Sequence, residues 1–218
     1  MVRKMAKEFD LSAFAVDGGF RLEDQTVENC RIIGTQYRNF DLIHCIFRGV
    51  VFENAFQGRP GQYVNIRDCC FTDCEFRDQY RGKAIRLTCC YNTFTDCLIV
   101  NMVYRSYEER AEICGDRFIN CHFRNIEIQG DVRVYDMEAT GGSARYVDYL
   151  GRSISRCTFS DMCFEDMLIK ADLTDNRMGN VLFRDVTVRG NDIDRNELIG
   201  CTNRYTLIRE RPDAGQTV

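Results

Sequence analysis

Residues 22–52, LEDQTVENCRIIGTQYRNFDLIHCIFRGVVF, place an apolar side chain at every fifth position. The members of this run are Leu22, Val27, Ile32, Tyr37, Leu42, Phe47 and Phe52. A second run with the same spacing lies further along the chain and consists of Leu173, Met178, Phe183, Val188, Ile193 and Leu198. An α-helix repeats every ~3.6 residues and a strand every ~2, so neither produces a period of five. The spacing therefore predicts a repeat architecture built from five-residue units.

The repeat unit has a recognisable composition around its apolar centre. The residue two positions before the centre is small, and an Asp or Asn often lies between them. Ala171-Asp172-Leu173-Thr174-Asp175 shows the whole pattern, and Cys74-Glu75-Phe76-Arg77-Asp78 shows it more loosely. The pattern resembles the pentapeptide-repeat family, whose consensus is Ala-Asp/Asn-Leu-X-X. The resemblance covers roughly residues 20–203 with interruptions, and many copies replace the central Leu by Phe and the Ala by Cys.

The resemblance implies an all-β fold, a right-handed quadrilateral β-helix with several loop insertions. Each pentapeptide would form one face, and four faces would close a coil whose neighbours stack at about 4.8 Å. The centre and the residue two before it would point inward. The residues expected to fill the axis are Leu42, Phe47, Phe52, Phe71, Phe76, Phe94, Phe118, Phe123, Phe159, Phe164, Leu173 and Phe183.

Interruptions of the five-residue spacing predict loops, because solenoids tolerate insertions that project from a coil. We expect an N-terminal cap or lead over residues 1–19, the β-helix over 20–203, and a C-terminal cap and tail over 204–218. The loops are expected at about residues 55–63, 79–90, 105–115 and 131–151.

Two of these loops carry a more specific signal. In 105–115, Ser106 with Glu109 three residues later forms a capping box before Gly115, which predicts one or two helical turns. The longest segment, 131–151, contains Gly141-Gly142 between apolar strand-like stretches and predicts a projecting hairpin.

Loops on a rigid scaffold are the usual place for binding residues. The alternative is that these segments are tolerated insertions without a function. The candidate partner-binding residues are Arg81, Lys83, Arg86, Tyr107, Glu108, Tyr135, Tyr146 and Tyr149.

The 13 cysteines fit the repeat better than they fit a disulfide framework. Seven of them occupy the small position two residues before a centre, namely Cys30, Cys45, Cys69, Cys74, Cys97, Cys121 and Cys157. Reduced cysteine behaves as a small apolar side chain, so most of these thiols are interpreted as core filler in a reducing compartment. No Sec signal or membrane-length apolar stretch is evident. We therefore expect a cytoplasmic protein, and export by a dedicated secretion system stays open.

Catalytic and metal-binding patterns are scarce. His44-Cys45 and Cys121-His122 are sequence neighbours, which the repeat places on opposite sides of the wall, so neither forms a Cys–His dyad. No C-x2-C zinc spacing, phosphate-binding loop or dinucleotide fingerprint is present. The sequence therefore predicts no catalytic residue, no metal and no cofactor, and favours a protein that is not an enzyme.

Three functional interpretations follow. The formal charge of −4 and the pI near 5.4 disfavour a general nucleic-acid binder. The favoured interpretation is a non-catalytic interaction protein that binds a macromolecular partner through its loops and the walls of the solenoid. No membrane association is expected. The resemblance offers an alternative: some family members mimic DNA and bind bacterial DNA gyrase or topoisomerase IV, inhibiting the enzyme or protecting it from quinolones. A second alternative is a secreted bacterial effector. The resemblance also implies a homodimer through the C-terminal end.

Overall fold

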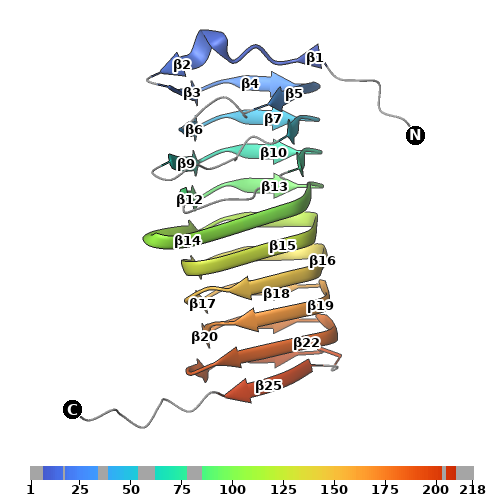
Figure 1. Ribbon diagram of the computed structural model, residues 1–218. Helices are drawn as coiled ribbons and strands as arrows, with labels where there is room; N and C mark the ends of the chain where they lie inside the picture. Colours follow the sequence, from blue (N-terminus) through green and yellow to red (C-terminus); the bar gives the residue numbers. More distant parts are fainter. Residues whose placement is uncertain are drawn as a thin grey trace, which may run out of the picture.

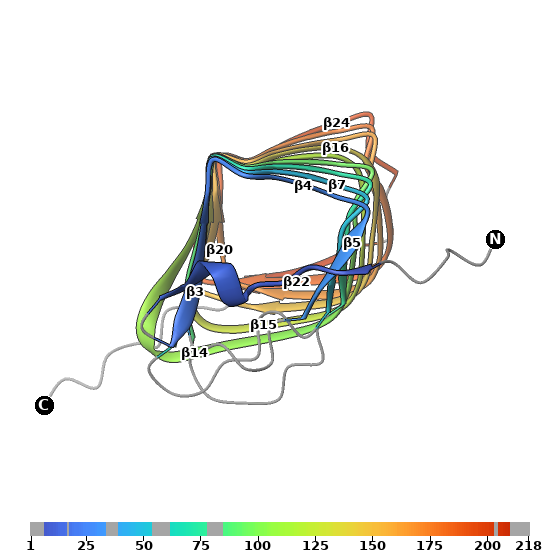
Figure 2. The ribbon, with the colours of Figure 1, turned by 90° about the horizontal axis from the view of Figure 1, so that it is seen from above.

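The computed structural model describes residues 7–16, 18–33, 39–53, 62–77, 85–202 and 205–209. Strands from successive repeats stack in parallel along one axis, with the N-terminal and C-terminal ends at opposite ends of the stack (Figure 1). Viewed along the axis, the coils superpose as a four-sided outline (Figure 2). The chain therefore folds as a four-sided parallel β-solenoid.

The four sides are called faces A, B, C and D in the order in which the chain follows them. Face D is built by β3 (Gly19–Glu23), β6 (Phe40–Ile43), β9 (Gln62–Arg67), β12 (Ile85–Cys90), the ends of β14 and β15, β17 (Ser153–Ser155), β20 (Asp172–Thr174) and β23 (Ile193–Asp194). Face A is built by β4 (Thr26–Glu28), β7 (Ile46–Arg48), β10 (Cys70–Thr72), β13 (Thr93–Thr95), the starts of β15 (Arg117–Tyr135) and β16 (Glu138–Leu150), β18 (Thr158–Ser160), β21 (Arg177–Gly179) and β24 (Glu197–Ile199).

In the first coils the described strands of this region belong to face B, and in later coils continuous strands span faces B and C. Face B contains β5 (Cys30–Ile33), β8 (Val51–Glu53), β11 (Glu75–Arg77), and parts of β14 (Leu98–Cys114), β15, β16, β19 (Cys163–Lys170) and β22 (Leu182–Gly190). The same long strands run on into face C, where β25 (Tyr205–Arg209) pairs with β22. At the N-terminal end lie β1 (Lys7–Glu8), the 3-10 helix η1 (Ser12–Phe14) and β2 (Ala15–Val16), which pairs antiparallel with β3.

The corners explain why Asp and Asn recur two residues after each centre. Asp24, Asn29, Asp68 and Asp175 have φ values of 54°, 51°, 52° and 56°. This left-handed region is unfavourable for most residues, and Asn and Asp tolerate it because their short polar side chains hydrogen-bond locally. The repeat therefore encodes the turn between faces as well as the core.

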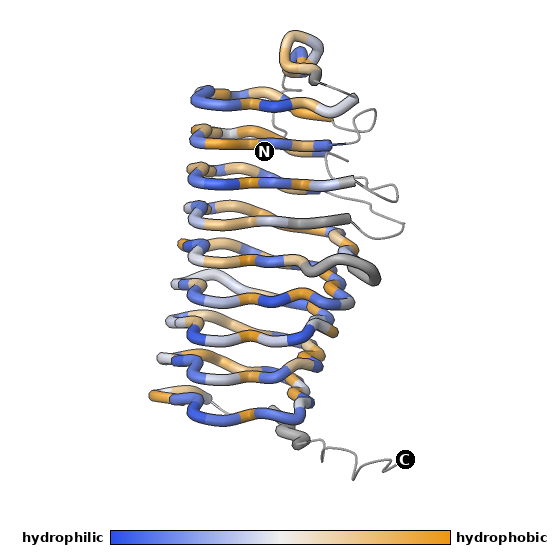
Figure 3. The backbone as a smooth tube through the Cα atoms, turned by 90° about the vertical axis from the view of Figure 1, so that its left-hand side faces the viewer, coloured by the Kyte–Doolittle hydropathy of each residue, from blue (hydrophilic) through white to orange (hydrophobic). Residues whose placement is uncertain are grey.

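The N-terminal half of the axis is filled by stacked aromatic rings. Phe47 stacks on Phe71 and Phe71 on Phe94, with ring centroids 5.0 and 4.7 Å apart, while Phe52 stacks on Phe76 at 4.7 Å. All five rings are at least 95 % buried. Among the other expected core residues, Leu42, Phe164, Leu173 and Phe183 are buried, whereas Phe118, Phe123 and Phe159 are only partly buried. The tube in Figure 3 shows apolar and polar residues alternating along each coil.

Residues 105–115 do not form helical turns, so that prediction is wrong. They lie in β14, which pairs with β15 on both sides of a register irregularity between Ser106 and Ala111. Ala111 is fully buried and Ile113 packs against the core. Stacking of these apolar residues outweighs the local capping signal, because helix propensity is a weak prior against tertiary packing.

The predicted hairpin over 131–151 is also wrong, because this segment completes β15 and forms β16 of the next coil. Ala139, Ala144 and Val147 are buried on the inner side. Gly141 and Gly142 make the corner between faces A and B, with φ values of 68° and 86°. A Cβ at Gly142 would clash with the carbonyl oxygen of Cys121, so the glycine pair serves close stacking and not a hairpin turn.

The two remaining loop predictions fall mainly outside the described residues. Of 55–63, only Gln62 and Tyr63 are described, and they begin β9. Of 79–90, residues 85–90 are described, and they form β12 of face D instead of a loop.

Candidate functional site

The predicted binding tyrosines differ in their exposure. Tyr146 is 43 % exposed, and the guanidinium of Arg145 lies 4.7 Å from its ring centroid. Tyr135 is partly buried. Tyr149 is buried, and its hydroxyl donates to the carbonyls of Val132 at 2.8 Å and Ser153 at 3.1 Å. Its assignment to a partner-binding loop is therefore corrected, since Tyr149 braces the interior of the solenoid.

The other predicted contacts lie outside what the structure describes. Arg81 and Lys83 belong to residues 78–84, which are not described. The backbones of Arg86, Tyr107 and Glu108 lie in β12 and β14, but their side chains are outside the described set. Their role as contacts stays a prediction.

Ion pairs connect consecutive coils on the outer walls. Arg156 binds Asp136 through Nε at 2.7 Å and Nη2 at 2.8 Å, and this pairing holds the pKa of the Asp136 carboxyl below its usual range. Arg48 pairs with Glu28 at 2.7 Å in the same way. These pairs are exposed, so each contributes only about 0–1 kcal/mol to stability. Their main effect is to neutralise charge along the walls.

This pairing bears on the acidic residues of the C-terminal coils. Arg195 binds Asp175 through Nη2 at 2.8 Å, Arg145 lies 3.4 Å from Glu165, and Arg177 lies 3.6 Å from Glu197. An evenly negative wall of the kind that imitates a phosphate backbone is therefore interrupted by arginines.

Most cysteines fill the core, as predicted. Cys74, Cys97 and Cys121 stack in one inward column and are at most 2 % exposed. Burial raises the pKa of the Cys30 and Cys157 thiols to about 11, so these groups stay protonated and unreactive. His44 and His122 are exposed on the outer wall.

One cysteine pair departs from the prediction of reduced thiols. Cys90 and Cys114 occupy the same register position on face D in consecutive coils, with Cα atoms 4.7 Å apart, and they form a disulfide. The residues are 24 apart in sequence. The bond therefore ties two coils together from the edge of the D wall.

A buried polar ladder lies at the corner next to this disulfide. Asn92 is fully buried, its Oδ1 accepts from the backbone N–H of Cys69 at 2.9 Å, and its own N–H donates to Oδ1 of Asp116 at 2.8 Å. Asp116 is also fully buried, and this burial raises the pKa of its carboxyl to about 6. Asn176 repeats the arrangement further down by accepting from Cys157. These groups replace backbone partners at tight corners.

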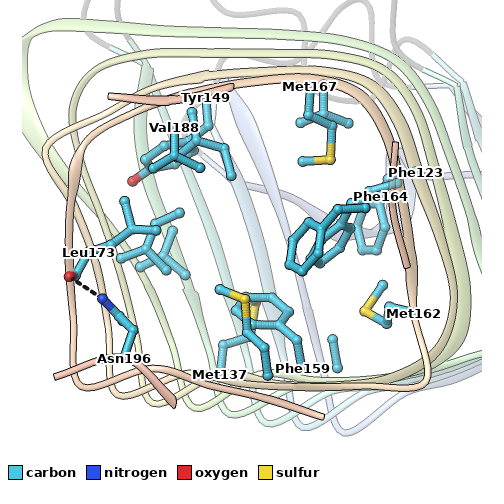
Figure 4. Close-up of a pocket in the computed structure, with 18 of the residues that line it drawn as sticks. Phe123, Met137, Tyr149, Phe159, Met162, Phe164, Met167, Leu173, Val188 and Asn196 are labelled. Atoms are coloured by element: carbon cyan, nitrogen blue, oxygen red, sulfur yellow. Dashed lines mark hydrogen bonds between the residues drawn. The ribbon is translucent and has the colours of Figure 1, made fainter. Parts of the chain in front are cut away.

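The C-terminal half of the axis is hollow. A cavity of about 500 Å³ runs from the coil that contains Ile113 and Phe118 to the last coil at Leu198. Figure 4 shows inward-pointing Phe, Met, Leu and Val side chains around an open centre.

The hollow begins where alanines interrupt the two aromatic columns. Phe118 is followed by Ala139 in the next coil, and Phe123 is followed by Ala144. The rings return one coil later at Phe159 and Phe164. Two missing rings at the same level leave the partly exposed faces of Phe118, Phe123 and Phe159 without packing partners on one side.

The cavity reaches the C-terminal end of the solenoid. Leu198 is the last member of its inward column, and it is 43 % exposed because no later coil of the described chain covers it. Asp194, Arg195 and Asn196 of this last coil border the cavity, and the side chains of Asp194 and Arg195 are exposed and pair with each other on the outer wall. An apolar interior thus meets solvent through a small polar rim.

The sequence analysis predicts no cavity, although the sequence contains a signal for one. Val134, Ala139, Ala144, Tyr149 and Ile154 continue the five-residue spacing into Phe159. Alanine at two centre positions does not resemble a core residue, and for this reason the spacing predicts a loop here. Small residues at consecutive inward positions are the sequence signature of an unfilled axis.

No group of three or more His, Cys, Asp or Glu side chains among the described residues has a geometry suited to a metal ion. The described part of the chain also contains no helix of the length and apolarity that crossing a membrane requires.

The fold defines the class of protein as a four-sided parallel β-solenoid with a five-residue repeat, consistent with the pentapeptide-repeat family that the sequence resembles. Neither a protein-family model nor a curated protein matches the chain.

Among solved structures, the chain is similar to HetL, a pentapeptide-repeat protein involved in heterocyst differentiation regulation in the cyanobacterium Nostoc sp. strain PCC 7120. Sequence identity is 9 %, over 84 % of this chain and 82 % of HetL, and the TM-score is 0.37. It is also similar to QnrB1, a plasmid-mediated fluoroquinolone resistance protein, at 12 % identity over 90 % of this chain and 88 % of QnrB1, with a TM-score of 0.23. Both TM-scores are below 0.5, so the fold assignment rests on the chain's own parallel ladders.

Proposed function

We propose that this protein is a non-catalytic interaction protein that binds a macromolecular partner on face C of its N-terminal half. One observation supports the proposal. Face B ends at Ile33, Glu53 and Arg77 in three consecutive coils, and these ends stack in register on β5, β8 and β11. Face D resumes with β6, β9 and β12, which also stack. Residues 34–38, 54–61 and 78–84 therefore all connect the same two walls.

Segments that link the walls of a rigid scaffold are the usual place for binding residues. The third connection contributes Arg81 and Lys83 in the sequence. Two cations in one short segment favour a partner with an acidic surface, because opposite charges accelerate association and select the partner.

A matched pair of charge-reversal variants tests this proposal. Arg81→Glu/Lys83→Glu alters the C side, and Arg48→Glu/Arg117→Glu makes the same change in net charge on face A. Each protein serves as bait in a bacterial lysate, with retained proteins quantified by mass spectrometry. We expect a partner that is kept by the wild type and the face A variant and lost by the C-side variant. Equal retention by both variants would contradict a binding surface on face C.

The DNA-mimic alternative has less support, because Arg145, Arg177 and Arg195 pair with the acidic residues that it requires. Retention of gyrase or topoisomerase IV subunits in the same pull-down, with release by added duplex DNA, would establish it instead. The exported-effector alternative rests on the sequence alone.

The C-terminal end supports a second kind of contact, a homodimer. Leu198 and Ile199 of β24 are 43 % and 52 % exposed, and within the described chain β24 pairs only with β21. An open strand edge with exposed apolar residues is a template for pairing with another chain. We expect Ile199→Asp to halve the mass measured by light scattering if the chain dimerises there, and an unchanged dimer would exclude this end.

A further inference from the structure

We propose that the hollow axis of the C-terminal half binds the single aliphatic chain of a molecule with an uncharged polar head, such as a long-chain alcohol. This inference is independent of the proposed partner surface on face C, because it concerns the inside of the solenoid. It rests on the shape of the cavity, on the chemistry of its lining and on the charges at its open end.

The cavity is long and narrow. Its lining follows one inward column through five coils, from Phe118 through Ala139, Phe159 and Met178 to Leu198. Four strand spacings of about 4.8 Å give a length of about 19 Å. A volume of about 500 Å³ along this axis is sufficient for one extended hydrocarbon chain.

The lining selects an apolar and conformationally adaptable occupant. Four of the chain's seven methionines point into this cavity, namely Met137, Met162, Met167 and Met178. Methionine is flexible and polarisable, and it moulds to irregular apolar surfaces. The hydroxyl of Tyr149 already donates to two backbone carbonyls. The wall therefore offers few hydrogen-bond partners to the polar groups of a sugar or a nucleotide, and burial of such groups without hydrogen bonds is unfavourable.

The charges at the open end select the head group. The Arg195 guanidinium is bound to Asp175 and lies 3.8 Å from the carboxylate of Asp194. Asn196 donates to the carbonyl of Leu173 at 2.8 Å, as Figure 4 shows, and accepts from Asn176. The Arg195–Asp175 pair lies on the outer wall, so no cation of the described lining faces a bound head group. A fatty-acid carboxylate would have no charged partner there, whereas a hydroxyl head needs none.

The first test uses the methionines as reporters inside the cavity. The full-length protein, labelled with carbon-13 at the methionine methyl groups, is titrated with dodecan-1-ol and followed by NMR. We expect the resonances of Met137, Met162, Met167 and Met178 to shift and saturate at one ligand per chain. Met102, which packs against the core outside the cavity lining, is the internal control and should not shift. No saturable shift, or an equal shift of Met102, would overturn the proposal.

The second test fills the bore. Ala139→Phe places a ring between Phe118 and Phe159 and should weaken dodecan-1-ol binding about 10-fold or more by occupying the space. Thr140→Phe introduces the same side chain at the neighbouring position on the outer wall, where Thr140 is exposed, and should leave binding unchanged. Unchanged binding in Ala139→Phe, or equal loss in both folded variants, would contradict binding on the axis.

A comparison of head groups tests the rim. We expect dodecanoate at pH 7 to bind at least about 10-fold more weakly than dodecan-1-ol, because no cation of the described lining faces its carboxylate. Dodecanoate binding that is equal or tighter would overturn the assignment of an uncharged head.

Discussion

Phe94 stacks on Phe118 with ring centroids 4.7 Å apart and planes 9° from parallel, and at the next level of this column Ala139 replaces the ring. Above this level the axis is filled by rings at strand spacing, and below it the axis is hollow. A side chain at the same inward position of the repeat therefore contributes differently to the free energy of unfolding in the two halves of the molecule.

Truncating a ring should be more costly in the filled half than in the hollow half. Phe71 is fully buried between Phe47 and Phe94, so Phe71→Ala should lower the free energy of unfolding by about 3–5 kcal/mol. Phe159 is only partly buried beside the cavity, so Phe159→Ala should cost about 1–2 kcal/mol, since fewer contacts are lost. Chemical denaturation of both variants measures the difference. Equal costs would show that the cavity is closed in solution.

Asp116 should make stability depend on pH. Burial raises its pKa in the folded chain to about 6, from an ordinary value of 3.8. Between about pH 4 and 6 the folded chain keeps a proton that the unfolded chain has released, so the free energy of unfolding falls as the pH rises through this interval. The loss is complete above the folded pKa and amounts to on the order of 3 kcal/mol.

Asp116→Asn removes the titrating group and keeps an oxygen that can accept from the N–H of Asn92. We expect the stability gained by this variant over wild type to be close to zero at pH 4 and to reach its full value by pH 7. Thermal unfolding of both proteins across this range provides the measurement. A difference that does not change with pH would mean that Asp116 is already ionised in the folded chain at pH 4.

The Cys90–Cys114 disulfide should stabilise the protein only under oxidising conditions. For a loop closed over 24 residues, the chain-entropy model gives a stabilisation of about 3 kcal/mol. In the absence of reductant, Cys114→Ser should lower the free energy of unfolding by this amount. In the presence of reductant, the variant and the wild type should be equally stable. Cys163→Ser, which alters a partly exposed thiol outside this bond, is the control. Thiol titration of the unfolded, unreduced protein should count eleven of the thirteen cysteines. Thirteen free thiols would show that the bond does not form.

Removing one complete coil should preserve the fold. Arg156 occupies the corner position of Asp136 one coil later, and Thr158 pairs with Glu138 in the same way. Deleting residues 136–155 therefore keeps every later strand in register, as nearest-neighbour stacking allows. Deleting residues 133–149 removes 17 positions, which is not a whole coil, and should unfold the C-terminal half. Circular dichroism and limited proteolysis distinguish the two deletions, and a folded product from both would refute the register.

The five-residue spacing was enough to predict the solenoid, its inward columns and its buried cysteines, because each repeat contacts only its neighbours and local pattern decides the packing. The spacing failed at Ala139 and Ala144, where inward positions carry side chains too small to be recognised as core. It also failed at Ser106, where the capping signal is visible in the local sequence. The competing interaction, the stacking of Ala111 on Val132, joins residues from consecutive coils and is not visible there. The disulfide and the Asn92–Asp116 ladder depend on which coils become neighbours, information that a single repeat does not contain.

The alanine pair on the axis also gives the molecule two mechanical regimes. A shaft filled with stacked rings resists bending and shear, because close-packed interiors have low compressibility. A tube with a cavity along its axis has fewer side-chain contacts across its interior, so it can flatten or widen at its mouth at lower energy. Face A should therefore be more rigid near β7 and β10 than near β21 and β24. One repeat pattern thus builds both a stiff N-terminal half and a more deformable C-terminal half.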